Sequence, residues 1–287
     1  MPELPEVEVL KRSLVKKIKF SKITKIIVYN RNLRYKVPRS INKNLESHIV
    51  NNISRISKYL IVHFNFSKKL LIHLGMSGTI YLIEKNKKKN TNASFYHSLA
   101  LPKKHNHIKI TFGNGIKMIY NDPRRFGYFK LLEKNYLLKE PIINLGPDPF
   151  SCKFSLEYIK KFIYKKKVNI KNLLMDQKFV GGIGNIYANE ILYYCKLRPT
   201  KNVNQLSNAN ILIIILQTRK VLSKAIHFGG SSIRDFKMIN GVPGNFQQTF
   251  KVYGKNNVKC PRKGCDGYIN KVLISNRSTF YCLKCQT

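Results

Sequence analysis

The sequence contains few acidic residues, and this shortage narrows the range of partners. Its 287 residues include 53 Lys and Arg but only 14 Asp and Glu, for a formal net charge of +39. Such an excess is far more than solubility requires. It indicates a polyanionic partner, of which nucleic acid is the commonest. An anionic membrane surface is the alternative. Because Lys is abundant along the whole chain, the charge does not locate the binding surface.

The sequence also lacks a long apolar segment. Its longest apolar run, residues 211–216, is far too short to span a bilayer. The first residues show no charged stretch followed by an apolar one, so no secretion signal is expected. We therefore expect a soluble, intracellular protein. Its length is enough to bury a sizeable core in two domains or more.

Short strands are predicted between residues 20 and 132. Seven β-branched or aromatic segments are separated there by turn signals, which is typical of a β-sandwich or barrel. These segments are ITKIIVY, YLIVHF, KLLIHL, TIYLI, HIKITF, IKMIY and YFKLL. Before them, Val7, Leu10, Leu14 and Ile18 recur at helical spacing. Residues 86–94 are polar and are expected to form a loop.

Helices are predicted in the second half of the chain. Residues 135–152 contain three prolines and are interpreted as a linker. Four segments with helical periodicity follow. They are SLEYIKKFIYKKK, IKNLLMD, IYANEILYYCK and NANILIIILQTRKVLSKAIHF. Residues 229–246 are rich in Gly and Ser and are predicted to form a loop. A small, cysteine-rich module ends the chain.

The terminal module contains four cysteines in two close pairs. Cys260 and Cys265 form the first close pair in the sequence, and Cys282 and Cys285 form the second. Sixteen residues separate the two pairs. This pattern indicates a tetrahedral zinc site with four thiolates, and a closed site of this kind is structural. Two disulfides are the alternative, but an intracellular protein disfavours them. The first pair has four intervening residues where two is commoner, and this spacing is permitted.

Three other residues near or outside this module need an interpretation. Arg277 precedes the second pair, where a rigid hairpin could present it to a phosphate or leave it as a solvated surface side chain. Cys152 and Cys195 are expected to be ordinary buried thiols.

Two further basic segments carry only weak local signals. VGGIGNIYANE at 180–190 places small residues before a helix that opens near Asn185, and such backbone N–H groups can bind anions. YKKKVNIK at 164–171 supplies four lysines nearby. Glycine turns between helices are common, however, and a lysine run is more often a solvated face.

Two loop tips combine apolar and basic residues. HLGMSG at 73–78 contains Met76, and NDPRRFG at 121–127 contains Arg124, Arg125 and Phe126. Apolar wedges beside cations occur in proteins that kink DNA and unstack bases. A core position for Met76 and Phe126 is the alternative, and it is favoured for either motif alone.

The first residues, MPELPEVEVL, also have two interpretations. Pro2, Glu3 and Glu6 could open a helix, because proline suits a first turn and acids there complement the helix dipole. On local grounds that is the better interpretation. It leaves open why a proline and two glutamates stand within the first six residues.

Together and in this order, these segments resemble one family, the formamidopyrimidine-DNA glycosylases, which are bacterial enzymes that remove oxidised purines. The matching segments are PELPEVE, KYL, HLGMSG, DPRRFG, GIGNIYANE and NRSTFYCLKCQ, and they span the whole chain. The related endonuclease VIII group prefers oxidised pyrimidines and differs after the first Pro-Glu, so LPEVE favours the purine branch. The resemblance implies an α+β multidomain fold. Its parts are an N-terminal catalytic β-sandwich with a leading helix (2–134), a helix–two-turn–helix DNA-binding domain (152–238) and a zinc-finger hairpin (252–286).

The resemblance assigns the chemistry to four residues. Removal of Met1 would leave Pro2 with a free secondary amine, which attacks C1′ of the damaged nucleotide, expels the base and forms a Schiff base. Glu3 is the implied acid/base. Lys58 is the implied proton donor for β-elimination and Arg277 the one for δ-elimination. The implied enzyme is thus a DNA glycosylase and AP lyase.

The resemblance also implies how DNA and zinc are bound. Met76, Arg124 and Phe126 would fill the space that a flipped base leaves. The implied phosphate contacts are Lys58, His105, Lys166 or Lys167, Lys171, Asn185 and Arg277. One structural Zn²⁺ would bind the four terminal cysteines. The expected protein is a cytoplasmic, bacterial monomer that acts at the nucleoid on double-stranded DNA with oxidised bases.

Two other functions stay open. One is an endonuclease VIII-like activity on oxidised pyrimidines, and the other is a zinc-containing DNA-binding homologue without catalysis. Intact Pro2, Glu3, Lys58 and Arg277 disfavour the second, because a pure binder needs no reactive terminus.

Overall fold

The computed structural model describes residues 2–84, 91–93, 102–231 and 246–287. The chain forms two compact units. The first comprises Met1–Ile143 and Ile226–Gln247, and the second comprises Asn144–Ala225 and Gln248–Thr287. The domain boundaries predicted from the sequence stay predictions.

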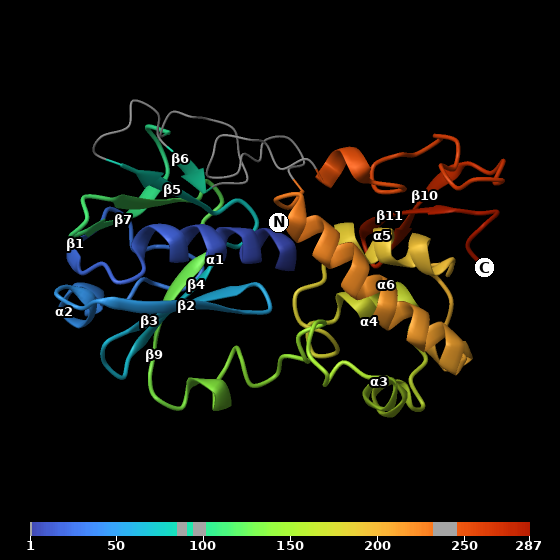
Figure 1. Cartoon of the computed structure of the whole chain (residues 1–287), viewed down its shortest axis with the longest axis horizontal. Helices are drawn as coiled ribbons and strands as arrows, with labels where there is room; N and C mark the ends of the chain where they lie inside the picture. Colours follow the sequence, from blue (N-terminus) through green and yellow to red (C-terminus); the bar gives the residue numbers. More distant parts are fainter. Residues whose placement is uncertain (1, 85–90, 94–101, 232–245) are drawn as a thin grey trace. The chain divides into compact units, whose positions relative to one another are not determined.

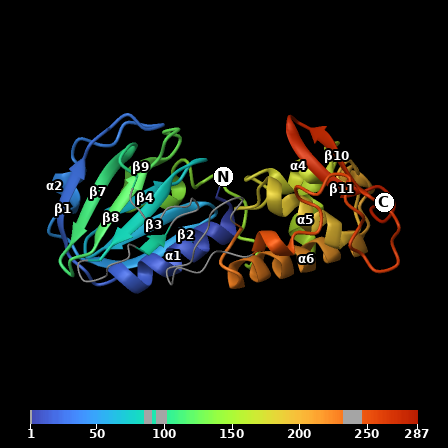
Figure 2. The same ribbon diagram turned by 90° about the horizontal axis from the view of Figure 1, so that it is seen from above.

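Two antiparallel sheets build the first unit (Figure 1, Figure 2). One has five strands in the order β1-β7-β8-β5-β6, and the other has four in the order β2-β3-β4-β9. The strands span Ile23–Val28 (β1), Val50–Ile56 (β2), Tyr59–Phe64 (β3), Lys69–His73 (β4), Thr79–Ile83 (β5), Thr91–Ala93 (β6), Asn106–Phe112 (β7), Lys117–Asn121 (β8) and Tyr128–Leu132 (β9).

One apolar core joins both sheets to the first helix. Helix α1 (Leu4–Ile18) buries Leu10 and Leu14 in a cluster that includes Ile53 of the four-stranded sheet and Ile108 of the five-stranded sheet. Each such side chain contributes about 1.5–3 kcal/mol when it is fully buried. The predicted sandwich with a leading helix is confirmed. Two short elements complete the unit's regular structure, α2 (Ile41–Leu45) and the 3₁₀ helix η1 (Tyr136–Leu138).

Two strands differ from the prediction. β2 was not among the predicted segments because its sequence, VNNISRI, is mostly polar. It buries Val50 and Ile53, while the asparagines between them are exposed. β6 lies inside the predicted loop at 86–94. There a short polar segment pairs with β5, as Ile80 opposite Ala93 shows. The remainder of that predicted loop lies outside the described residues.

Helices and a terminal hairpin build the second unit. They span Leu156–Ile163 (α3), Ile170–Met175 (α4), Asn185–Cys195 (α5), Val203–Gln205 (η2), Asn208–His227 (α6, which ends in the first unit), Phe246–Thr249 (η3, which begins there), Ile269–Ile274 (β10) and Arg277–Cys282 (β11). The prediction of a helical region followed by a cysteine-bearing hairpin is confirmed. No helix in the described part of the chain combines the length and the apolar character that a membrane crossing demands.

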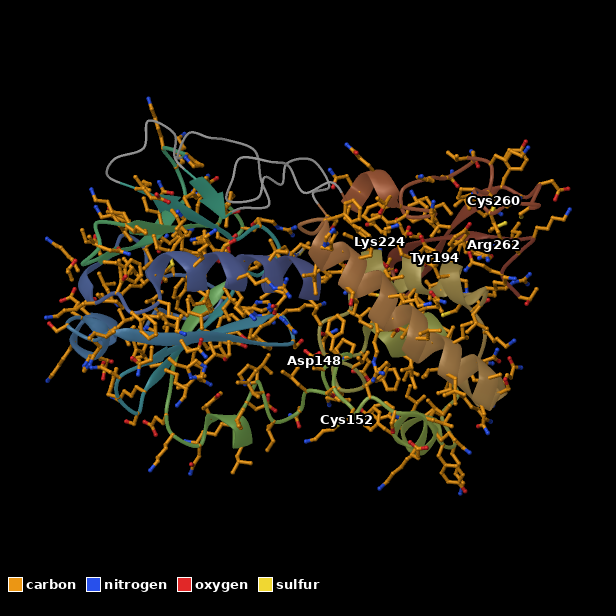
Figure 3. All side chains as sticks on the ribbon, in the orientation of Figure 1. Asp148, Cys152, Tyr194, Lys224, Cys260 and Arg262 are labelled. Atoms are coloured by element: carbon orange, nitrogen blue, oxygen red, sulfur yellow. The ribbon has the colours of Figure 1, made fainter. Side chains whose placement is uncertain are left out.

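Two other expectations have different outcomes. Cys195 is buried as predicted, but Cys152 is exposed, so the expectation of a buried thiol there was wrong (Figure 3). Cys152 follows a turn that Asp148 organises by accepting the N–H of Phe150 at 2.9 Å, and this turn leaves the thiol at the surface. Of the Gly- and Ser-rich segment predicted as a loop, residues 232–245 lie outside the described residues.

Candidate functional site

The first residues of the chain are buried. Pro2 is buried, and Glu3 is only 3% exposed at the position that caps α1. The backbone N–H of Glu3 donates to the Glu6 carboxylate at 2.9 Å. Pro5 occupies the first turn, where its missing N–H is not needed. The segment therefore opens a helix, as predicted, and its capping box fixes the position of Glu3; the catalytic interpretation stays a prediction.

Glu6 also binds the beginning of the Gly- and Ser-rich segment. One carboxylate oxygen accepts the Ser231 N–H at 2.7 Å and the Ser231 hydroxyl at 2.9 Å. Gly230 has φ +84°, and a Cβ added there would lie 3.2 Å from the Glu6 Cγ. The positive φ favours glycine there, and any side chain would also crowd Glu6. The Glu6 carboxylate therefore binds both the start of α1, at Glu3, and Ser231.

Lys58 lies in the turn between β2 and β3 and is 6% exposed. Arg55 holds this turn by donating to the Ser57 carbonyl at 3.0 Å. Glu8 on α1 in turn pairs with Arg55 at 3.0 Å. Burial raises the pKa of Glu8, but hydrogen bonds from basic side chains outweigh it and hold that pKa below its usual value. The helix that begins beside Pro2 therefore also positions the turn of Lys58.

His73, at the end of β4, lies close to Lys58. Burial first, and then the charges of Lys58 and Arg34, lower the pKa of His73 to about 4 against the opposing charge of Asp122. The imidazole is therefore neutral at pH 7, and its Nδ1 accepts the Gly75 N–H at 3.2 Å. Through this bond, the surroundings of Lys58 are connected to the loop that carries Met76.

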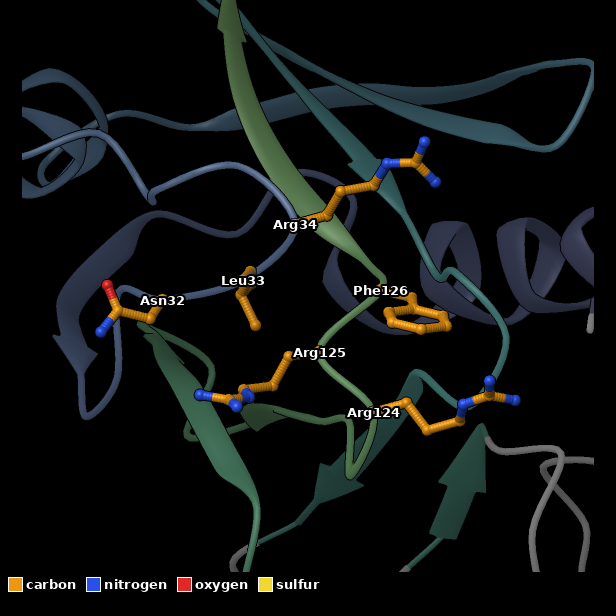
Figure 4. A pocket seen from close by; sticks show the side chains of 6 residues that line it. All are labelled: Asn32, Leu33, Arg34, Arg124, Arg125 and Phe126. Atoms are coloured by element: carbon orange, nitrogen blue, oxygen red, sulfur yellow. The ribbon is translucent and has the colours of Figure 1, made fainter.

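The two predicted loop tips are exposed, so the core interpretation of their apolar residues was wrong. Met76 is 39% exposed and Phe126 is 41% exposed. The Arg124 guanidinium lies 4.6 Å from the Phe126 ring centroid, a cation–π contact. Arg124 and Phe126 project to the same side of their loop, whereas Arg125 points away from them (Figure 4).

Two cavities flank these loops. A cavity of about 390 Å³ is lined by Phe126 and by residues that include Arg34, Arg124 and Arg125 (Figure 4). A second, of about 620 Å³, is lined by Ser77 and His105 among other polar and basic residues.

In the second unit, Lys171 and Asn185 bind the hairpin strand β11, whose first residue is Arg277. Lys171 is fully buried, and its Nζ donates to the Thr279 hydroxyl at 2.6 Å. Asn185, the first residue of α5, donates to the Ser278 carbonyl at 3.0 Å. Burial lowers the pKa of Lys171 to about 8, and the charge of Arg277 contributes. Lys171 and Asn185 therefore both lie against β11 at its Arg277 end, and their role as phosphate contacts stays a prediction.

The lysine run before α4 is different. Lys167 is exposed, and Lys166 turns its Nζ over the Phe162 ring, 3.4 Å from the centroid. The interpretation of the run as a solvated face fits these residues, while Lys171, four positions on, is buried.

The four terminal cysteines meet in one cluster. Their sulfur atoms all lie within 4.8 Å of one another. The Cys260–Cys285 and Cys265–Cys282 sulfur distances are both 3.7 Å. This is far beyond the disulfide length of about 2.05 Å. It agrees with the edge of a tetrahedron whose metal–sulfur distance is about 2.3 Å. The cluster can hold a metal ion, and its donor set suits zinc.

Side chains of α5 attach this module to the helical region. The Asn189 oxygen accepts the Phe280 N–H at 2.7 Å. The buried Glu190 carboxylate accepts the N–H groups of residues 251–253 at 2.9–3.0 Å. Arg262 donates to the Cys285 sulfur at 3.3 Å and lies near Cys260 (Figure 3).

Several of these anchors were not recognised in the sequence: Glu8, Arg55, Asn189 and Glu190. One signal could have found the acids. In a chain with only 14 acidic residues, an acid inside an apolar segment such as IYANEILYY must have a specific partner.

Comparisons with known families show which family the chain belongs to. Residues 1–129 match the family model described as the formamidopyrimidine-DNA glycosylase N-terminal domain. Residues 145–237 match the one described as the formamidopyrimidine-DNA glycosylase H2TH domain.

Individual proteins match over the full length. A curated formamidopyrimidine-DNA glycosylase of Rickettsia felis is 40% identical over 286 residues, which is 100% of this chain and 98% of that protein. One of Roseobacter denitrificans is 35% identical and covers 100% of both chains. A Lactococcus lactis Fpg in complex with DNA containing an abasic site gives a TM-score of 0.86 at 32% identity and covers 99% of both chains. A complex of the wild-type Lactococcus lactis Fpg with DNA containing N7-benzyl-Fapy-dG gives 0.86 at 33% identity and covers 100% of both.

Proposed function

Because the chain belongs to the formamidopyrimidine-DNA glycosylase family, we propose that it excises oxidised purines by attack of the Pro2 amine on the damaged nucleotide. As a member of this family it is a DNA glycosylase and AP lyase that binds DNA. One observation carries the assignment of the chemistry. The first unit buries Pro2 and Glu3 and, through Glu8 and Arg55, fixes the turn of Lys58 to the same helix.

Pro2 is the proposed nucleophile after removal of Met1. Its ring nitrogen forms a bond to C1′, the glycosidic bond breaks, and the base departs with a proton. An α-amino group has a pKa of about 7.7–8.0 in model compounds, so a useful fraction is unprotonated near neutral pH. Glu3 acts as the acid/base that protonates the sugar oxygen. Its backbone N–H bond to Glu6 holds it in place beside Pro2.

Elimination follows from the iminium. The positive nitrogen acidifies the C2′ proton, so the 3′ phosphate leaves by β-elimination and the 5′ phosphate by δ-elimination. Lys58 is the proposed proton donor for the first step, and Arg277 for the second. His73 beside Lys58 is neutral at pH 7, so this imidazole supplies no competing acid for that step.

The same proposal places the DNA contacts. Met76, Arg124 and Phe126 enter the stack where the damaged base leaves, which their exposure on two loop tips supports. The proposed phosphate contacts are Lys58, His105, Lys166 or Lys167, Lys171, Asn185 and Arg277. Zn²⁺, held by Cys260, Cys265, Cys282 and Cys285, would stabilise the hairpin that presents Arg277 and takes no part in the chemistry.

Substrate comparison tests the proposed lesion class. We expect excision of 8-oxoguanine opposite cytosine to exceed excision of thymine glycol by roughly tenfold or more in kcat/KM, because the two bases offer different hydrogen-bonding edges. Single-turnover cleavage of both duplexes measures it. A preference for thymine glycol would favour the pyrimidine-specific function. Binding to both duplexes without cleavage or a trapped adduct would favour a non-catalytic homologue.

The lowered pKa of Lys171 predicts that DNA binding is accompanied by proton uptake. With a pKa of about 8, the Lys171 ammonium is about half deprotonated at pH 8 in the free protein and nearly fully protonated near pH 6. A phosphate beside it restores the charged form, so DNA binding should take up a proton. We expect an uptake that approaches about one proton near pH 9 and vanishes near pH 6.

Calorimetry of binding to an uncleavable abasic-analogue duplex, in buffers of different ionisation enthalpy, measures this uptake. Lys171→Met should remove the uptake, and Lys167→Met, which changes an exposed lysine, should retain it. Equal uptake by Lys171→Met and the wild type would contradict a phosphate contact at Lys171.

A further inference from the structure

The two loops that carry Met76 and Phe126 are joined by one buried carboxylate. Asp122 is fully buried at the end of β8. Its Oδ1 accepts the Ser77 hydroxyl from one loop and the Arg124 N–H, at 3.2 Å, from the other. Its Oδ2 accepts the Tyr120 hydroxyl at 2.9 Å and the Gly127 N–H at 2.8 Å. Four donors thus meet the two oxygens.

The backbone of Asp122 is fixed as well. Its N–H donates to the His105 carbonyl at 3.0 Å. Its carbonyl lies 2.8 Å from His107 Nε2, which must therefore carry the proton. His105, a proposed phosphate contact, is thereby connected to the same point.

The backbones of the two loops also pack directly against each other. Gly75 has φ +64°, and a Cβ there would lie 2.4 Å from the Gly127 nitrogen. A Cβ at Gly127 would lie 1.7 Å from the Tyr120 hydroxyl oxygen. Glycines therefore allow the two backbones to close around the hydroxyl that Asp122 binds. Arg124 and Phe126 lie between two anchored residues, Asp122 and Gly127.

Only a carboxylate satisfies this arrangement. An ionised carboxylate accepts at both oxygens, about four sites in all, and donates at none. An asparagine would replace one oxygen with an NH₂ group. In either orientation that group would face a backbone N–H, from Arg124 or from Gly127, which can only donate. Two opposed donors in a buried site push the loop away.

We propose that Asp122 is a positioning residue for base extraction. By joining the two loops, it fixes the positions of Met76, Arg124 and Phe126 relative to one another, so that all three can enter the duplex together. The proposal rests on the proposed function of those three side chains. Asp122 touches neither the sugar nor the nucleophile. Its loss should therefore affect only reactions in which a paired base must first leave the stack.

Two substrates separate positioning from general damage to the fold. One is a duplex with 8-oxoguanine opposite cytosine, and the other is a single-stranded oligonucleotide with a preformed abasic site. For Asp122→Asn we expect single-turnover excision from the duplex to fall on the order of 100-fold, since misplacement by about 1 Å can have that effect. Cleavage of the single-stranded abasic site should stay within about twofold of wild type.

Three further variants complete the test. Phe126→Ala should show the pattern of Asp122→Asn. Ser77→Ala removes one donor and keeps the carboxylate, so it should give the same pattern with a loss of roughly tenfold, even if Asp122→Asn fails to fold. Glu46→Gln alters a carboxylate of the same unit that binds the Ile26 N–H, and it should leave both reactions unchanged.

The outcomes decide between the proposals. Equal loss on both substrates in Asp122→Asn and Ser77→Ala, or no loss in either, would overturn the role of Asp122. A different pattern in Phe126→Ala would overturn the connection to base extraction. If the wild type cleaved abasic DNA but no lesion duplex, the proposed function itself would fail together with the inference.

Discussion

Protein that retains a residue before Pro2 is expected to form no covalent adduct with lesion DNA when borohydride is added. With Met1 or a tag attached, the proline nitrogen belongs to a tertiary amide, whose electron pair is delocalised and cannot attack C1′. We expect trapping and excision to fall by on the order of a thousandfold or more, as for removal of other catalytic nucleophiles. Intact-mass measurement of each preparation verifies its N-terminus, and gel separation quantifies the adduct.

Matched preparations separate this chemistry from damage to the fold. The same extension placed after Thr287 should leave trapping unchanged. Pro2→Gly keeps a terminal amine but loses the ring, so it should trap weakly. Peptide mapping then locates the attached DNA. An adduct on Lys58, or full trapping by protein with intact Met1, would contradict the proposed nucleophile.

The sequence predicts most of the fold because most elements are defined by local pattern. β3 and β4 are apolar runs bounded by turn residues, and α6 shows clear helical periodicity. β2 escapes this approach, since its polar residues face solvent and only its pairing with β3 makes it a strand. β6 is similar, because its three residues, two of them polar, form a strand only beside β5.

The candidate site is predictable as a set of residues but not as a geometry. Motifs identify Pro2 and Glu3, yet the partner of Glu6 is Ser231, 225 positions away. No local pattern reports such a distance. The same holds for Lys171. The lysine run suggests a solvated side chain, whereas folding buries this one against Thr279. Long-range packing decides which basic residues form a site and which form a surface.

Loss of the proposed zinc ion is expected to unfold the terminal module and to weaken DNA binding strongly. The apolar cluster around the cysteines is small and contains Val252, Ile269 and Phe280, so burial alone cannot hold the hairpin. Structural zinc contributes about 10–16 kcal/mol in comparable modules. Without the metal, β11 would lose its position beside α5, and Arg277, the first residue of β11, would no longer be held in place. We expect Cys282→Ser to lower the affinity for an abasic-analogue duplex by on the order of 100-fold at fixed salt.

Elemental analysis, circular dichroism and a binding titration together test this expectation. Cys152→Ser is the matched control, because Cys152 is exposed and lies outside the cluster, so it should keep both metal and affinity. Unfolding should stop at the module. Side chains of α5 such as Asn189 receive the hairpin, but the helix itself is held by the buried Ile191 and Leu192. The first unit should therefore keep its melting transition. If Cys282→Ser lost zinc but bound DNA as tightly as the control, Arg277 and its hairpin would have no part in the interface.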